Sequence, residues 1–275
     1  MRLASSFRSI NSLRSDRPLD DYQIAGVAPS ILATSAHESR SERYTYIPTI
    51  DVLNGLRKEG FQPFMVCQTR TRAEGKRDHT KHMIRLRHAD QIEGREANEI
   101  VLLNSHDGSS SYQMIAGMFR FVCANGMVCG DTFGEVRVRH SGNVIDNVIE
   151  GAFEVLKTFD KATEQREGME VVTLSEREQE VFANAALSLK YEPTEGAPAP
   201  ITADQILMPR RFEDKKSDLW TTLARVQENM IKGGVRARTA NGRRTQTRAV
   251  NGIDQNIKLN RALWVLAEQM KALKA

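Results

Sequence analysis

The chain has 275 residues, of which 40% are hydrophobic and 27% charged, and its formal net charge is +4. These values are typical of a globular protein with one large domain or two smaller ones. Because no run of about 18 uncharged apolar residues occurs and the first residues lack an apolar run of signal-peptide length, we expect a soluble, cytoplasmic protein without a membrane-spanning helix or a secretory leader.

Charge is distributed unevenly along the chain. Residues 231–261 carry eight Lys and Arg against one Asp, a net charge of +7, and residues 61–88 carry seven against two acids, a net charge of +5. Residues 143–196 hold twelve acids and five bases, a net charge of −7. Such asymmetry is expected of a protein that meets a polyanion with one face. The alternative is that the basic segment is simply solvated, or that it docks on the protein's own acidic helices.

The first part of the chain predicts a helix followed by two strands. Residues 1–48 form a polar N-terminal arm in this interpretation, and residues 49–60 are expected to form a short helix between a possible cap and Gly60. Strand-like sequences follow at 61–71 and 79–88, with a polar turn between them.

The second of these strands alternates in character. Ile84 and Leu86 fall on one face, and Arg85 and Arg87 fall on the other. The pattern therefore predicts a strand with a basic, solvent-facing side.

A second hairpin is predicted around "NSHDGSSS", residues 104–111. Its flanking strands are "EIVLLN" and "YQMIAGMFRFVC", so residues 61–123 are expected to form a mostly antiparallel sheet of about four strands. The fold class predicted is α+β, with helices packed on this sheet.

The remaining sequence has helical periodicity. One long helix is expected at 144–165, another begins at Ser175 with Glu178 in capping-box spacing, and a linker follows at 192–200. Two further helices, at 217–232 and near the C-terminus, enclose the basic, Gly/Thr-rich stretch. The predicted domains are the polar arm, an α+β core and a helical C-terminal subdomain with a basic loop: 1–48, 49–191 and 192–275.

The turn "NSHDGSSS" could be a catalytic site or a structural turn. A catalytic interpretation would take His106 as a base, Asp107 as its orienter and a nearby serine as nucleophile, but adjacent side chains in an extended chain point apart. Asn, Asp and Gly are turn formers, so we favour the structural hairpin.

Metal and nucleotide sites find no support in the sequence. Cys123 and Cys129 match neither a zinc ribbon nor a ferredoxin spacing, Asn125-Gly126 predicts a tight turn between them, and no P-loop motif occurs. Together with Cys67 they fit buried, reduced thiols. We expect no metal and no cofactor.

Four long strings carry a resemblance to a known family. They are "HESRSERYTYIPT" (37–49), "NSHDGSSSYQMIAGMFRFVCANGMVCG" (104–130), "DLWTTLARVQENMIKGG" (218–234) and "ALWVLAEQMKALK" (262–274). The chain resembles, over essentially its whole length, the YafZ/YfjQ family of prophage and plasmid proteins, a domain of unknown function (932). The resemblance implies no activity or catalytic residue, but it implies a bacterial mobile element, where replication, recombination and defence are the usual functions.

The leading hypothesis is a non-enzymatic protein that binds single-stranded DNA in replication or recombination, with a basic strand face as platform and a basic loop as clamp. Tyr44, Tyr46 and Tyr112 could stack on bases, and self-association into a homo-oligomer is left open. The alternative is a protein-interaction or antirestriction factor that acts on a host enzyme, and a metal-dependent nuclease ranks last. The predicted nucleic-acid contacts are Arg70, Arg72, Lys81, Arg85, Arg87, Arg236, Arg238, Arg243, Arg244 and Arg248.

Overall fold

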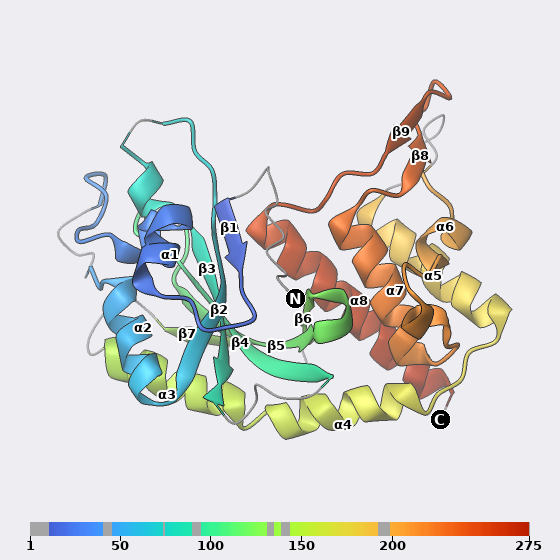
Figure 1. Ribbon diagram of the computed structural model, residues 1–275, viewed down its shortest axis with the longest axis horizontal. Coiled ribbons are helices and arrows are strands. Elements are labelled where there is room, and N and C mark those ends of the chain that lie inside the picture. Colours follow the sequence, from blue (N-terminus) through green and yellow to red (C-terminus); the bar gives the residue numbers. More distant parts are fainter. Residues whose placement is uncertain are drawn as a thin grey trace. The chain divides into compact units, whose positions relative to one another are not determined.

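The structure is a computed structural model (Figure 1). It describes residues 11–40, 46–73, 75–89, 95–130, 135–138, 144–191 and 199–274. The chain divides into two compact units, of which unit 1 comprises Met1–Val128 and Thr132–Phe159, and unit 2 comprises Cys129–Asp131 and Asp160–Ala275. The division falls after residue 159, whereas the sequence suggested a boundary at 192.

Unit 1 is built on an antiparallel sheet with the strand order β1-β2-β3-β4-β5-β6, in which β7 also pairs with β5. The predicted α+β class and both predicted hairpins are confirmed, but the sheet has seven strands within the described residues instead of about four. The additional strands are only four residues long. The sequences of β1 and β6 show no apolar alternation, and the alternation in β7 is too short to identify a strand by itself. The strands are β1 (Asn11–Arg14), β2 (Phe61–Gln68), β3 (His82–His88), β4 (Glu96–Asn104), β5 (Tyr112–Arg120), β6 (Asn125–Val128) and β7 (Glu135–Val138).

The N-terminal segment is part of unit 1 and not a free polar arm from residue 11 onward. Strand β1 pairs antiparallel with β2, with Leu13 opposite Val66. The helix α1 (Asp21–Val27) and the 3-10 turn η1 (Pro29–Leu32) follow, and Ile24 and Ile31 are fully buried. These apolar residues anchor the segment because their burial removes apolar surface from water.

Two helices complete the described part of unit 1, α2 (Thr49–Lys58) and α3 (Val144–Leu156). The predicted helix at 144–165 is in fact two helices, because the chain breaks before α4 (Phe159–Glu170). At this break the backbone amide of Thr158 donates to the carbonyl of Val155, and so does its hydroxyl at 2.7 Å. A Thr side chain that bonds a nearby carbonyl competes with continuation of the helix.

Unit 2 is mainly helical and contains α4, α5 (Glu176–Lys190), α6 (Ala203–Leu207), α7 (Leu219–Lys232) and α8 (Ile253–Leu273). The predicted capping box of Ser175 and Glu178 begins α5, and the side chain of Asp218 caps α7. Trp220 and Trp264 meet edge to face in the core, with 6.1 Å between ring centroids. A two-stranded ribbon, β8 (Arg236–Arg238) and β9 (Arg244–Gln246), connects α7 to α8 and extends beyond the helix ends as a thin projection (Figure 1).

None of the helices in the described part of the chain is both long enough and apolar enough to cross a membrane.

Candidate nucleic-acid interface

The basic loop predicted between two helices is the antiparallel ribbon β8–β9, with its turn, here called the arginine hairpin (residues 236–246). Arg236 lies opposite Gln246, Ala237 opposite Thr245, and Arg238 opposite Arg244. Because successive side chains of a strand alternate and cross-strand partners share a face, Arg236, Arg238 and Arg244 lie on one face of the ribbon.

Backbone contacts hold the arginine hairpin at both ends of β8. The backbone amide of Arg238 donates to the carbonyl of Pro200 at 3.0 Å, and the side-chain Nε2 of Gln205 on α6 donates to the carbonyl of Arg236 at 2.9 Å. At the base, Gly233 follows α7 with a φ of 65°, and a Cβ there would lie 2.6 Å from the carbonyl carbon of Arg248. The two arms of the ribbon therefore approach too closely for any residue but glycine.

The arginines of this segment face solvent. Arg236, Arg238, Arg243, Arg244 and Arg248 are exposed, and none forms an ion pair with an acid of the described residues. Among the described residues, the guanidinium of Arg238 donates to the carbonyl of Gly242 in its own turn, at 3.3 Å, and to no acid. This exposure argues against docking on the acidic helices. It also leaves Arg238 and Arg244 as like charges directly across the ribbon, which is unfavourable without an anion.

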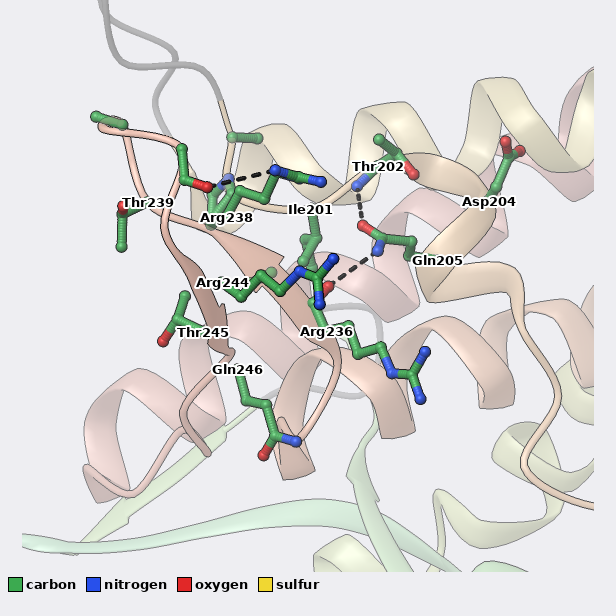
Figure 2. A pocket seen from close by; sticks show the side chains of 15 residues that line it. Ile201, Thr202, Asp204, Gln205, Arg236, Arg238, Thr239, Arg244, Thr245 and Gln246 are labelled. Atoms are coloured by element: carbon green, nitrogen blue, oxygen red, sulfur yellow. Dashed lines mark hydrogen bonds between the residues drawn. The ribbon is translucent and has the colours of Figure 1, made fainter.

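A hollow of about 1340 Å³ lies between the arginine hairpin and the start of α6, here called the hairpin hollow. In Figure 2 the guanidinium groups of Arg236, Arg238 and Arg244 lie on the same side of the ribbon as Gln205, whose side chain bridges the two walls. Asp204 is the single acid among the described residues that line it, so the hollow is suited to an anion. Hydroxyl and amide groups add uncharged donors: Thr202, Thr239, Thr245, Gln205 and Gln246.

The second basic block lies in unit 1 and is only partly at the surface. Arg70 and Arg72 are exposed in the loop after β2, and Lys81, just before β3, is half-buried. The loop is closed at its base by the amide of Thr69, which donates to the carbonyl of Lys81 at 2.7 Å.

The prediction that Arg85 and Arg87 form a basic, solvent-facing side of β3 is wrong. Arg85 is 2% exposed and Arg87 is fully buried, and both donate to Glu99 on β4, at 2.8 and 2.9 Å. The Arg87 guanidinium lies 4.3 Å from the ring centroid of Phe64 and 4.1 Å from that of Phe119, a cation–π arrangement. These partners on neighbouring strands replace water, which a pattern within one strand cannot show.

The buried guanidinium of Arg85 also explains why position 126 is a glycine. The predicted tight turn at Asn125-Gly126 is wrong, because both residues belong to β6 and the chain turns earlier, at Ala124 with a φ of 49°. A Cβ on Gly126 would lie 2.5 Å from Nη1 of Arg85. Arg85 also donates to the carbonyl of Met127 at 3.1 Å. Gly126 therefore allows a buried guanidinium to approach the backbone of β6.

The turn at 104–111 is a structural turn. Asp107 accepts from the amide of Ser109 at 2.9 Å, Ser105 accepts from the amide of Ser110 at 2.8 Å, and Gly108 has a φ of 76°. Burial raises the pKa of Asp107, but hydrogen bonds from Ser109 and Ser105 outweigh it and lower the pKa below its ordinary value.

His106 belongs to a buried polar cluster around the Thr49 hydroxyl. His82 Nδ1 lies 3.2 Å from the carbonyl of Thr80, which can only accept, so Nδ1 carries the hydrogen and Nε2 accepts from Thr49 at 3.0 Å. His106 Nε2 and Asn104 Nδ2 then donate to Thr49, at 3.1 and 3.0 Å. All these side chains are buried, so a substrate has no access to them.

Metal-ligating side chains do not gather in the described residues, where no group of three His, Cys, Asp or Glu could hold an ion. Cys67, Cys123 and Cys129 are buried and belong to no disulfide, which fits the predicted buried, reduced thiols. Burial raises the pKa of Cys67 to about 12, so its thiolate is disfavoured.

The structure describes two of the three tyrosines suggested for stacking, and it buries one of them. Tyr44 lies outside the described residues, the Tyr46 hydroxyl donates to the carbonyl of Ala33, and Tyr112 is buried with its hydroxyl 3.2 Å from the carbonyl of Ile47. Sequence reasoning missed Phe212, a 79% exposed aromatic in unit 2. Its position among charged residues, in "RRFEDKK", was the available signal.

Comparison with known proteins places the chain in a family. The family described as "Domain of unknown function (DUF932)" matches residues 36–264. The chain belongs to the DUF932 family. Two Escherichia coli (strain K12) relatives, "UPF0380 protein YafZ" and "UPF0380 protein YfjQ", are each 55% identical over 269 residues, which cover 98% of this chain and 97% of each relative. No solved structure matches this DUF932 protein.

Proposed function

We propose that this DUF932 protein binds nucleic acid without catalysing a reaction, and that it holds single-stranded DNA at the arginine hairpin. The observation that carries the proposal is the set of exposed arginines with no acidic partner among the described residues. Phosphates would neutralise Arg238 and Arg244, which lie directly opposite each other. Each contact would release counterions from the strand, which is the main source of affinity in sequence-independent binding.

The form of the hairpin hollow supports a single strand over a duplex. A free two-stranded ribbon can enter the major groove of B-DNA, which is about 12 Å wide. Here Gln205 and Pro200 join the ribbon to the α6 segment through bonds of 2.9 and 3.0 Å, so α6 borders its arginine face. A single strand can follow such a groove with its phosphates toward the arginines. We place this activity in replication or recombination of a mobile element, on the basis of the family resemblance.

The test is a salt titration of binding to a labelled oligothymidylate. Replacing Arg236, Arg238 and Arg244 together by alanine should weaken binding and flatten the slope of log K against log salt by about two, since each lost phosphate contact on a single strand contributes roughly 0.7. The melting temperature should stay nearly unchanged because the three side chains are exposed.

A matched control removes equal charge from exposed positions of unit 2 outside the arginine hairpin. Its substitutions are Lys161→Ala, Arg177→Ala and Lys258→Ala. This variant should retain nearly all of the affinity, whereas an equal loss in both variants would show that net charge alone governs binding. No binding of the wild type to DNA or RNA at low salt would remove the proposal and favour a factor that binds a host protein.

A further inference from the structure

The segment after α6 exposes two large apolar side chains. Met208 is 66% exposed and Phe212 is 79% exposed, and they lie four residues apart. Contact of such apolar side chains with water is unfavourable, and a partner that covers them lowers the free energy. Held on a fixed backbone, two large apolar side chains so close in sequence offer a surface that a partner can cover.

Polar contacts with α7 fix the backbone between them. Arg210 donates through Nε to Asn229 at 2.7 Å and through Nη2 to the carbonyl of Gly233 at 2.6 Å. Asn229 in turn donates to the carbonyl of Met208 at 3.0 Å. The contact with Gly233 ties this segment to the base of the arginine hairpin.

An ion-pair cluster holds the next residue of the segment. Arg211 donates to both carboxylate oxygens of Glu228, at 2.9 and 2.8 Å, and to Asp214 at 2.6 Å. Burial raises the pKa of Glu228, but hydrogen bonds from Arg211 and Lys232 outweigh it and keep the pKa below its ordinary value. Both arginines are thus engaged with α7, and Phe212 stays at the surface.

The surroundings of Phe212 indicate the kind of partner. The Lys215 ammonium lies 5.0 Å from the centroid of the Phe212 ring, and Lys216 is exposed beside it in sequence. An aromatic face next to cations suits a flat base that carries a phosphate. In a duplex the base faces are covered by their neighbours, so only a single strand can offer one.

We propose that Phe212 stacks on a base of a single strand whose phosphates are held at the arginine hairpin, an inference that rests on the proposed function. Gln205 lines the hairpin hollow and precedes Phe212 by seven residues, which limits their separation to about 25 Å. Met208 lies between them in sequence and adds apolar surface along this path. Phe212 thus adds to the preference for single strands that the form of the hairpin hollow supports.

The experiment compares the affinity of variants for a labelled oligothymidylate and for a duplex of equal length. Phe212→Ala should weaken single-strand binding about five-fold or more, since base–aromatic stacking is worth at least about 1 kcal/mol, and should leave duplex binding and the salt slope unchanged. Phe212→Trp should restore single-strand affinity. Phe212→Leu, which keeps an apolar side chain but no ring, should not.

Tyr22→Ala is the matched control, because Tyr22 is an 88% exposed aromatic on α1 of unit 1, and it should bind both ligands as the wild type does. Equal losses for single strand and duplex in Phe212→Ala, or wild-type affinity in Phe212→Leu, would overturn stacking. If the wild type binds no nucleic acid, both proposals fail. If it binds and Phe212→Ala matches it, only this inference fails.

Discussion

His82 shows how burial sets the chemistry of one side chain. It accepts a hydrogen bond from Thr49 and donates one to the Thr80 carbonyl, an arrangement that requires the neutral ring. Burial lowers the pKa of His82 from 6.5 to about 4. Between these two pH values, His82 is therefore protonated in the unfolded chain and neutral in the folded protein.

This difference predicts a loss of stability in mild acid. As pH falls from 6.5 toward 4, the unfolded state binds a proton at His82 and the folded state does not, so the free energy of unfolding should fall by about 1.4 kcal/mol per pH unit and about 3 kcal/mol in all. Urea unfolding at a series of pH values measures this. His82→Gln should lack this part of the decline, and a full decline in that variant would assign it to another group.

At the scale of an element, two adjacent glycines at the base of the arginine hairpin differ in whether a side chain would fit there. Gly233 and Gly234 both have positive φ, at 65° and 76°. A Cβ on Gly233 would lie 2.6 to 2.7 Å from backbone atoms of Arg248 and Ala249, whereas a Cβ on Gly234 would meet nothing within 4 Å. Position 233 is therefore restricted to glycine by space as well as by backbone conformation, and position 234 by backbone conformation alone.

We predict that Gly234→Ala costs about 1 kcal/mol of stability, the strain of a left-handed backbone alone. Gly233→Ala should cost clearly more and should also weaken nucleic-acid binding, because it separates the two arms of the ribbon. Chemical unfolding and a binding titration on both variants measure the two effects. Equal costs would show that the base of the hairpin relaxes to admit a side chain.

For the whole molecule, the exposed loop after β2 gives unit 1 cations of its own that can bind phosphate. Arg70 and Arg72 are exposed there. We predict that they contact phosphates of DNA, so that replacing both by alanine flattens the salt slope by roughly 1.4 and adds to the effect of the hairpin substitutions. A salt titration of the combined variant is the measurement. An unchanged slope would restrict the interface to the arginine hairpin.

Much of the fold could be predicted because its signals are local. The capping box at Ser175 and the helix that Asp218 begins depend on residues within one turn, and the structure has them as expected. The short strand β1 could not be predicted, because its pairing with β2 depends on residues some fifty positions away. The break after α3 was missed because apolar periodicity continues across it.

The candidate site was predictable in part for the same reason. The exposure of Arg236 follows from a Gly/Thr-rich basic segment, which has few apolar residues to bury. The burial of Arg85 and Arg87 depends on Glu99 and on rings from β2 and β5, which only the assembled sheet brings together. The pattern of charge along a strand does not show whether its arginines are exposed or buried.

The opposed pair Arg238 and Arg244 also has a consequence for local dynamics. Repulsion across the ribbon should make it open more often than the helices beside it, so its amide hydrogens should exchange early with solvent deuterium. An anion that binds both guanidinium groups favours the closed ribbon, and by thermodynamic linkage it must slow this exchange. Hydrogen–deuterium exchange with and without oligothymidylate would then locate the bound strand without any substitution.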